Sequence, residues 1–415
     1  MQNLKKLEQA DVKGKKILLR VAYDITLAEE NLPTGQAGEK MIVPDDTRIR
    51  ATVPTIEYLL KQGCSLGLLS WLKRPAGKVV ENLRMQPVAD KLSELLARPV
   101  KALKDCVGTE VQKEIKAMKP GDIIMLENVR FHPEEEKADQ QFAKELCEGF
   151  EFIVYDAFAQ AMRMHASTTG ILQVLPSASG FLFEKEITTL SHLLENPERP
   201  FVAVMGGAKI SDRVGVMENL IKKADRILIG GALANTFLLA QGHKVEKSLV
   251  EDVFVDTARG EKKDYLKICQ DLLQKAQDRL QLPLDMLAAE SAEGGDVRVI
   301  NIDEGEHLPA GWAYFDIGPR TIDLYSQILK AAKLAFANGP MGLFEIDRFA
   351  GGTKHVAEAM LSSGATTVIG GGDTESIVVR YGWEGRFTHV STGGGASLEF
   401  LAGKEFPVMK YLVKK

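Results

Sequence analysis

The chain has 415 residues, of which 45% are hydrophobic and 26% are charged, and its formal net charge at pH 7 is -5. This length exceeds what one ordinary core holds and predicts two domains, or three at most. The slightly acidic balance disfavours a nucleic-acid-binding protein, whose contact surface is basic. Since no stretch reaches the roughly eighteen apolar residues of a membrane span, we expect a globular protein that binds neither nucleic acid nor membrane.

The cysteines and the first residues bear on the cellular compartment. Cys64, Cys106, Cys147 and Cys269 lie far apart and show no metal-ligand or C-x-x-C spacing. This is typical of reduced, buried thiols. The first sixteen residues are charged and contain no apolar core of a secretory signal. The sequence therefore predicts a cytoplasmic protein.

In chain order, short apolar runs alternate with longer amphipathic segments. The runs are residues 16–23, 65–70, 122–128 and 151–158 in the first half, and 201–207, 226–231, 332–339, 366–372 and 387–395 in the second half. Strands that alternate with helices predict parallel sheets covered by helices on both faces, which is the α/β class.

The segment over residues 185–199 is expected to be a helix that joins two domains. It is amphipathic, ends at Asn196-Pro197, and is followed at once by an apolar run. The alternative is one large sheet in which this helix is an ordinary crossover. We prefer an N-terminal domain over 1–184, a linking helix over 185–199 and a C-terminal domain over 200–398. The segment 399–415 is expected to pack back on the N-terminal domain.

Three segments of the second half share one design, an apolar run followed by a glycine cluster and a helix start. They are VMGGAKISDR (204–213), VIGGGDTES (368–376) and VSTGGGASLE (390–399). At the carboxyl ends of parallel strands such loops meet at one edge of the sheet, where their N–H groups can bind phosphate. Neither a P-loop nor a dinucleotide fingerprint is present. The three loops together predict a nucleotide site.

Charged residues follow two of these glycine clusters. Lys209 and Arg213 could neutralise phosphate oxygens, although each could equally belong to a solvated first helical turn. Asp373 could hold Mg²⁺, which prefers oxygen ligands, or cap its own helix, and the two roles are compatible.

The first half carries arginines near the predicted strand ends and in nearby loops, with histidines around them. They are Arg20, Arg48, Arg74, Arg130 and Arg163, with His132 and His165. Any one arginine is best explained as solvated surface, but several at strand ends favour a site for an anion. An anion site in one domain and a nucleotide site in the other predict phosphoryl transfer across a cleft that closes.

The whole chain resembles the phosphoglycerate kinase family. The resemblance rests on ordered stretches that include DDTRIRA (45–51), LENVRFHPEEEKAD (126–139), RMHAST (163–168), GGAKISDR (206–213), DIGPRTI (316–322), NGPMGLFE (338–345) and STGGGASLE (391–399). It implies two Rossmann-like domains joined by a hinge helix, one for the acceptor and one for Mg-ADP or Mg-ATP. It also implies a monomer whose partners are a nucleotide and an anionic acceptor.

The resemblance also implies roles for single residues. It assigns nucleotide binding to Gly206, Gly207, Lys209, Arg213, Gly231, Asn338, Pro340, Glu345, Gly371, Gly372, Asp373, Thr374, Gly393, Gly394 and Gly395, with Asp373 as the Mg²⁺ ligand. It assigns catalysis to Arg48 and Lys209. It assigns acceptor binding to Arg20, Asp24, Trp71, Arg74, Arg130, Met162, Arg163 and His165.

The acceptor half departs from the family pattern at four positions. Ala22 stands where the family has aspartate, Asp24 where it has asparagine, and Trp71 and Met162 where it has histidine. The segment 28–44 is also longer than expected. We therefore retain three hypotheses: a phosphoglycerate kinase, a relative that phosphorylates another carboxylic acid, and a nucleotide-binding regulatory protein with little turnover.

Overall fold

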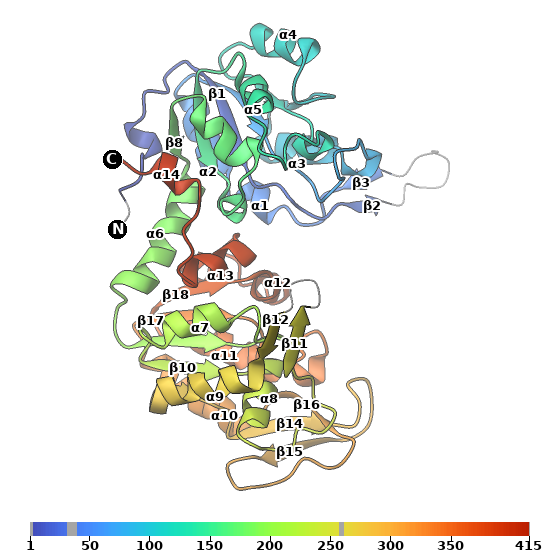
Figure 1. Ribbon diagram of the computed structural model, residues 1–415, viewed down its shortest axis with the longest axis vertical. Coiled ribbons are helices and arrows are strands. Elements are labelled where there is room, and N and C mark those ends of the chain that lie inside the picture. Colours follow the sequence, from blue (N-terminus) through green and yellow to red (C-terminus); the bar gives the residue numbers. More distant parts are fainter. Residues whose placement is uncertain (1–2, 31–39, 257–260, 415) are drawn as a thin grey trace. The chain divides into compact units, whose positions relative to one another are not determined.

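The computed structural model describes residues 3–30, 40–256 and 261–414. Contacts divide the chain into two compact units, Met1–Thr188 with Glu405–Lys415, and Thr189–Lys404. Helix α6 (Phe181–Glu195) crosses the division. Each unit contains a six-stranded sheet (Figure 1) in which all neighbouring strands are parallel, so the predicted α/β class with two parallel sheets is confirmed.

The sheet of the first unit has the order β5-β6-β4-β1-β7-β8. Its strands are β1 (Lys16–Val21), β4 (Ser65–Leu69), β5 (Lys101–Ala102), β6 (Ile123–Met125), β7 (Phe152–Asp156) and β8 (Ser177–Ser179). Arg20 pairs with Leu69 of β4 on one side and with Tyr155 of β7 on the other. The segments that follow these three strands therefore start at the same edge of the sheet.

Alternate residues of these strands build the core on one face. Leu19, Leu68 and Val154 pack with the apolar sides of α2 and α3 in one buried cluster. On the opposite face Gly67 leaves room for Phe150, because a Cβ there would lie 2.3 Å from the ring. The helices of this unit are α1 (Thr47–Arg50), α2 (Val53–Lys61), α3 (Gln86–Leu96), α4 (Thr109–Ala117), α5 (Gln140–Cys147) and α14 (Met409–Leu412).

Short elements complete the first unit. They are the antiparallel pair β2 (Ala28–Glu30) and β3 (Lys40–Ile42), the π-helix η5 (Ala166–Gly170), and the 3₁₀ turns η1 (Leu7–Gln9), η2 (Glu81–Leu83), η3 (Val129–Phe131), η4 (Phe158–Gln160) and η6 (Ile171–Gln173). The middle of the long segment 28–44, residues 31–39, lies outside the described residues.

Residues from both ends of the chain meet in the first unit. The N–H of Lys5 donates to the carbonyl of Leu412 at 2.7 Å, and the N–H of Lys414 donates to the carbonyl of Asn3 at 2.7 Å. Phe406 packs on Phe158 with 5.6 Å between ring centroids. The C-terminal part of this unit begins at Glu405 rather than at residue 399, because residues up to Leu401 form a helix of the second unit.

The sheet of the second unit has the order β13-β10-β9-β17-β18-β19. Its strands are β9 (Phe201–Met205), β10 (Arg226–Ile229), β13 (Leu280–Gln281), β17 (Leu334–Asn338), β18 (Thr366–Gly370) and β19 (His389–Val390). Numbered along the chain, this is the doubly wound order 3-2-1-4-5-6, and its order reverses between β9 and β17. Open α/β sheets bind ligands at the carboxyl ends of the strands beside such a reversal.

Helices lie over both faces of this second sheet (Figure 1). They are α7 (Val214–Leu220), α8 (Gly231–Ala240), α9 (Tyr265–Ala276), α10 (Pro319–Lys330), α11 (Gly351–Ser362), α12 (Gly372–Arg380) and α13 (Gly395–Leu401). The remaining elements are the antiparallel sheets β11 (Val253–Asp256) with β12 (Glu261–Asp264), and β14 (Asp285–Ala289) with β15 (Val297–Asn301) and β16 (Ala313–Ile317), and the turns η7 (Gln277–Arg279) and η8 (Asp347–Phe349).

The nine apolar runs identified in the sequence each contain a strand of one of the two main sheets. The helix expected over 185–199 begins earlier, at Phe181, and ends at Glu195. All four cysteines are buried and form no disulfide, as predicted. Within the described ranges, none of the helices combines the length and the apolar character that crossing a membrane requires.

Candidate active site

The three glycine-rich segments each connect a strand of the second sheet to a helix, as predicted. The first joins β9 to α7, the second joins β18 to α12, and the third joins β19 to α13. Gly371 and Gly394 are the N-cap residues of α12 and α13, and Gly371 has a φ of 92°, a conformation that favours glycine. The segments thus meet at the carboxyl edge of the sheet, beside the reversal between β9 and β17.

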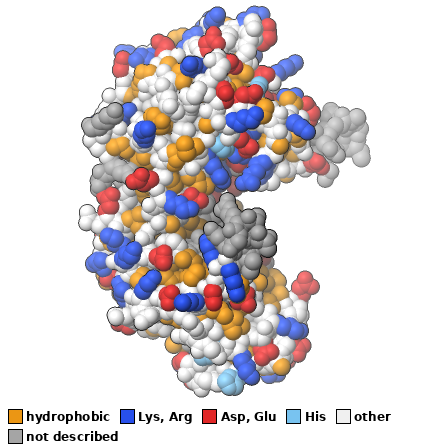
Figure 2. Space-filling model, viewed as in Figure 1, with side chains coloured by type: hydrophobic (Ala, Val, Ile, Leu, Met, Phe, Trp, Pro, Cys, Tyr) orange, Lys and Arg blue, Asp and Glu red, His pale blue; other side chains and the backbone are white. Residues whose placement is uncertain are grey.

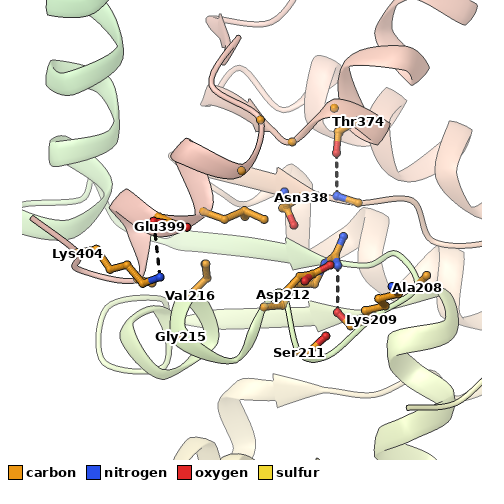
Figure 3. Close-up of a pocket in the computed structure, with 18 residues that line it drawn as sticks. Ala208, Lys209, Ser211, Asp212, Gly215, Val216, Asn338, Thr374, Glu399 and Lys404 are labelled. Carbon is orange, nitrogen blue, oxygen red and sulfur yellow. Dashed lines mark hydrogen bonds and ion pairs between the residues drawn. The ribbon is translucent and has the colours of Figure 1, made fainter. Parts of the chain in front are cut away.

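A cavity of about 700 Å³ opens where these segments meet (Figure 3). It is lined by Ala208, Lys209, Ser211, Asp212, Arg213, Gly215, Val216, Asn338, Gly339, Gly371, Gly372, Thr374, Gly394, Gly395, Leu398, Glu399, Ala402 and Lys404. Eight of these were predicted from the sequence as nucleotide-binding: Lys209, Arg213, Asn338, Gly371, Gly372, Thr374, Gly394 and Gly395. The structure therefore brings together residues that are almost 190 positions apart in the chain.

Basic side chains and backbone amides make this cavity suitable for an anion. Nη1 of Arg213 donates to the carbonyl of Lys209 at 3.0 Å, which holds the guanidinium at the wall. Nζ of Lys404 forms an ion pair with Glu399 at 3.6 Å (Figure 3). The amino end of α12, with Gly371 and Gly372 in the lining, adds N–H groups and a favourable helix dipole.

Asn338, at the end of β17, presents a polar atom that the protein leaves unpaired. Its side chain is buried, and Nδ2 donates to the carbonyl of Gly370 at 2.7 Å. Its Oδ1 has no hydrogen-bond partner among the described residues. Next to it, the N–H of Gly339 donates to Oγ1 of Thr374 at 2.7 Å (Figure 3). These bonds fix the end of β17 to the start of α12 and leave an acceptor for a ligand.

Other predicted nucleotide residues adjoin the cavity without lining it. The N–H of Gly207 donates to the carbonyl of Pro340 at 2.8 Å, and the N–H of Gly231 donates to the carbonyl of Met341 at 2.7 Å. A Cβ on Gly206 would lie 2.1 Å from the Pro340 oxygen. These glycines therefore let the loops after β9 and β10 pack directly on the loop after β17.

The remaining predicted residues of this half are less constrained. Glu345 is exposed, and the N–H of Gly393 donates to Oγ of Ser391 at 3.2 Å. Asp373 is the second residue of α12, between lining residues Gly372 and Thr374, and its side chain lies outside the described part of the structure.

Sequence reasoning missed ten lining residues. Five of them already lie inside the glycine-rich segments 204–213 and 390–399: Ala208, Ser211, Asp212, Leu398 and Glu399. Gly215 and Val216 follow the first segment and could have been found by extending it. The others are Gly339, Ala402 and Lys404. Lys404 follows α13 with no local pattern that marks it, so only the fold reveals it.

The first unit places two of its five predicted arginines, Arg20 and Arg130, against one tryptophan. Trp71, which follows β4, is 2% exposed. The guanidinium carbon of Arg20 lies 4.4 Å from the centre of its ring, and that of Arg130 lies 4.2 Å from it. Both are cation–π contacts. Burial lowers the pKa of Arg20 and of Arg130 from the usual arginine value. The two charges that we expected to bind an acceptor thus stack on an aromatic side chain.

Asp24, beyond the end of β1, ties this cluster together. Its Oδ2 accepts from Nε1 of Trp71 at 3.3 Å, and its Oδ1 accepts from the N–H of Lys73 at 2.9 Å. Nη1 of Arg48 donates to the Asp24 carbonyl at 2.8 Å. Nη1 of Arg130 donates to the Lys73 carbonyl at 2.5 Å. The carboxylate is therefore already engaged by the protein.

A second layer of polar residues supports Arg20. Its Nε donates to the carbonyl of Ser167 at 2.9 Å, while its Nη2 is buried and has no partner among the described residues. Glu135, fully buried, accepts from Oγ of Ser167 at 2.6 Å and from its N–H at 2.8 Å. Nδ1 of His165 lies 3.6 Å from Glu135, and its ring centre lies 5.3 Å from that of Trp71. Glu135 and Ser167 were not predicted.

Contacts therefore join six predicted residues of the first unit, which we call the arginine cluster: Arg20, Asp24, Arg48, Trp71, Arg130 and His165. Arg74 is exposed and acts on Arg130 only electrostatically. Arg163 is exposed and Met162 is half-buried, both in the turn that precedes His165. Ala22 is buried beside β1.

Comparisons with known proteins agree over the whole chain. The model of the family described as "Phosphoglycerate kinase" matches residues 7–404. A phosphoglycerate kinase of Pelotomaculum thermopropionicum is 45% identical over 415 residues, 99% of each chain, and one of Rubrobacter xylanophilus is 46% identical over 406 residues, 98% of this chain and 97% of the other. The solved phosphoglycerate kinase of Coxiella burnetii superposes with a TM-score of 0.82 at 33% identity, covering 98% of each chain.

Proposed function

Because the chain belongs to the phosphoglycerate kinase family, we propose that it transfers the γ-phosphoryl group of ATP reversibly to the carboxylate of 3-phosphoglycerate, a reaction of glycolysis. The products are ADP and 1,3-bisphosphoglycerate. The observation that supports this most directly is the cavity at the β9–β17 reversal, with Lys209, Arg213 and glycine N–H groups in its wall. Family members are phosphotransferases with a carboxyl group as acceptor, so a general base is not needed to ionise the nucleophile.

On the nucleotide side, we assign the polyphosphate to the cavity. Lys209 and Arg213 neutralise its oxygens, the N–H groups of Gly371, Gly372, Gly394 and Gly395 donate to them, and Asn338 and Thr374 orient them. The adjoining surface around Gly206, Gly207, Gly231, Pro340 and Glu345 takes the nucleoside. Gly393 shapes the turn before α13.

The family chemistry uses a nucleotide with Mg²⁺, and we assign the ion to Asp373. The fit rests on position: the residues on either side of Asp373 line the cavity, and a carboxylate is the ligand type that Mg²⁺ prefers. When bound, Mg²⁺ neutralises charge on the phosphate oxygens. The protein's own residues then have to hold the nucleotide in one orientation.

On the acceptor side, we assign the substrate phosphate to Arg74, Arg130 and Arg163, with Arg20 and His165 behind them. Arg48 and Lys209 stabilise the charge of the transferring phosphoryl group, the main task of the protein in such reactions. Transfer requires the carboxylate oxygen and the γ-phosphorus to be aligned at bonding distance.

A coupled assay with 3-phosphoglycerate and Mg-ATP tests this function. We expect turnover by the wild-type chain, a large loss in Lys209→Met, and little change in Lys222→Met, a control at an exposed position just beyond α7. Absence of turnover in the wild type would contradict the proposal, and equal turnover in the two variants would remove Lys209 from catalysis.

One observation favours a second candidate, transfer to a carboxylic acid other than 3-phosphoglycerate. Trp71 occupies the space between Arg20 and Arg130, and Asp24 brings a carboxylate next to it. A negative group there repels an acidic substrate, and Ala22 offers no hydrogen bond to a substrate hydroxyl. Together these residues change which groups of an acceptor, other than its phosphate, the arginine cluster can bind.

Restoring the family residues separates the two candidates. The set Ala22→Asp, Asp24→Asn, Trp71→His and Met162→His is expected to raise kcat/KM for 3-phosphoglycerate if the natural acceptor is another acid. If the natural acceptor is 3-phosphoglycerate, the wild type is already efficient and the four changes bring no gain. The third hypothesis, a regulatory protein, predicts nucleotide binding with little turnover for any acid.

The proposal extends to the state of the protein in the cell. We expect a cytoplasmic monomer that binds small molecules and not nucleic acid. Figure 2 shows acidic and basic side chains interspersed over the face that it presents, without the single-sign surface that a nucleic acid requires. Sedimentation of the purified chain at several concentrations tests the monomer.

A further inference from the structure

A cluster of three possible metal ligands lies in the first unit. Asp105, Cys106 and His132 bring a carboxylate, a thiol and an imidazole within 4.8 Å of one another. None of the three has a role in the phosphoryl transfer proposed above. We propose that these three residues bind a zinc ion.

The backbone that carries the ligands is held in place. Asp105 and Cys106 follow β5, and the N–H of Glu127, beyond β6, donates to the carbonyl of Asp105 at 3.3 Å. His132 ends the turn η3, and its N–H donates to the carbonyl of Val129 at 3.1 Å. Ligands on supported backbone need little reorganisation to bind a metal.

The buried residue Asn128 fixes that turn further. Its Oδ1 accepts from the N–H of Arg130, and its Nδ2 donates to the carbonyls of Leu72 and Leu83, at 2.9 and 3.1 Å. His132 also packs on Phe142 with 5.1 Å between ring centres. The imidazole is thus oriented by contacts that do not involve the other two ligands.

The three donor types match zinc better than magnesium. Thiolate and imidazole are soft or borderline ligands, whereas Mg²⁺ takes oxygen ligands. Nε2 of His132 lies 2.7 Å from Oδ1 of Asp105. Ligand atoms of a tetrahedral zinc lie about 3.4 Å apart, so this pair has to separate by less than 1 Å. Zinc takes the place of the proton on Nε2 of His132, which moves through solvent to Nδ1 of the same ring, and the thiol proton of Cys106 passes to solvent.

The solvent exposure of the three side chains and the charges around them both bear on metal binding. Cys106 is 2% exposed, while the side chains of His132 and Asp105 are 28% and 52% exposed, so an ion can enter from that side and water can supply a fourth ligand. The acidic residues Glu134 and Glu145 interact electrostatically with His132, and Glu127 and Glu135 interact with Cys106. Arg84 pairs with Glu127 at 3.1 Å, so Glu134, Glu135 and Glu145 supply the negative charge that attracts a divalent cation. The ion also has to displace the proton of the Cys106 thiol, whose pKa is raised by burial.

The test uses the metal-free full-length chain without nucleotide. Zn²⁺ is titrated in competition with a chromogenic chelator, and Co²⁺ binding is followed by the absorption band of a cobalt–thiolate bond. We expect one tight Zn²⁺ per chain and a cobalt–thiolate band. Cys106→Ser removes the band, and Cys106→Ser and His132→Gln each weaken Zn²⁺ binding at least tenfold.

Matched controls are available in the second unit. Cys269→Ser removes another buried thiol and His355→Gln removes another imidazole, and both are expected to keep wild-type Zn²⁺ affinity and the band. If Cys106→Ser fails to fold, His132→Gln and Asp105→Asn test the site instead, because these two positions are more exposed. Wild-type affinity in both of these, or no tight Zn²⁺ in the unsubstituted chain, overturns the proposal.

Discussion

The nucleotide cavity of the second unit and the arginine cluster of the first unit lie at corresponding edges of their sheets but are built from different groups. The cavity is open, and glycine backbone forms much of its wall. The arginine cluster is closely packed: Arg20 and Trp71 are buried, and the Asp24 carboxylate accepts hydrogen bonds from Trp71 and Lys73. One site offers N–H groups that hardly depend on side chains, and the other depends on side chains entirely.

This difference explains where specificity can change. A phosphate bound by backbone amides is insensitive to most substitutions nearby, because every residue carries the same N–H. An acceptor bound by arginines is recognised through their exact partners, so a new tryptophan or aspartate alters it directly. The four departures from the family pattern described above, at positions 22, 24, 71 and 162, lie in the first unit, where binding depends on side chains.

The largest expected effect comes from the arginine assigned to the transferring group. Arg48→Ala is expected to lower kcat about 10³-fold, since a positive charge at the transferring phosphoryl group contributes that much in related reactions. Arg50→Ala is the control, because Arg50 lies in the same helix, is 63% exposed and pairs with Asp46. Steady-state kinetics check both. Equal kcat values for the two variants would place the catalytic charge elsewhere.

The packed character of the cluster is tested by removing its centre. Trp71→Ala is expected to lower the free energy of unfolding by about 3–5 kcal/mol, because a large buried side chain leaves a cavity. Trp71→Phe keeps a ring between Arg20 and Arg130 and loses the hydrogen bond to Asp24, at about 1 kcal/mol. Urea denaturation measures both. A cluster that tolerates Trp71→Ala without loss would not be packed as described.

The open site is tested through its proposed metal ligand. Asp373→Asn is expected to weaken Mg-ADP binding about tenfold, or 1.4 kcal/mol, and to leave binding of ADP without Mg²⁺ nearly unchanged. Isothermal titration with and without Mg²⁺ measures this difference. Ser376→Ala, on the same helix, is the control. Equal weakening in the absence of Mg²⁺ would show that Asp373 does not act through the metal.

The two units also share a feature, a buried carboxyl at the end of a strand. Burial raises the pKa of Asp156 in β7 to about 6 and that of Asp316 in β16 to about 7, from 3.8. Between 3.8 and these values the folded chain keeps the proton that the unfolded chain releases. The stability that each protonated carboxyl contributes is therefore fully present below pH 3.8 and is lost as the pH rises through the pKa of the folded state.

The free energy of unfolding of the wild type, relative to that of Asp316→Asn, is expected to fall by roughly 2–3 kcal/mol between pH 5 and pH 8, and urea denaturation at each pH measures it. For Asp156→Asn the decline ends nearer pH 6. Asp347→Asn is the control, because Asp347 is 96% exposed. A difference that does not change with pH would mean that Asp316 is ionised throughout.

The sequence predicts those features of the structure that depend on residues close together in the chain. The strands and glycine-rich turns were predictable, because an apolar run and the residues after it are neighbours in the chain. Family stretches also pointed to Asn338 and Thr374. The closing of the cavity by Lys404 was not predictable, because it depends on how α13 packs against α7, where Gly215 allows an approach to Ala402.

The same reasoning applies to the arginine cluster. Its members were predicted, but the stacking of Arg20 and Arg130 on one Trp71 ring was not, since that ring lies between side chains from separate segments of the chain. Nor could the sequence show that the buried carboxylate of Glu135, which has no basic partner at hydrogen-bonding distance among the described residues, holds Ser167 next to Arg20. Such partners are set by packing between remote segments.

The meeting of both chain ends in the first unit has a consequence for biosynthesis. Residues 405–415 are translated after the whole second unit, yet Leu412 and Phe406 contact Lys5 and Phe158. During translation the first unit therefore emerges without residues 405–415. These residues can pack on it only after the second unit has been synthesised. Because the N–H of Lys414 donates to the carbonyl of Asn3, linking these two positions and opening the chain at an exposed turn is expected to yield a circular permutant that folds.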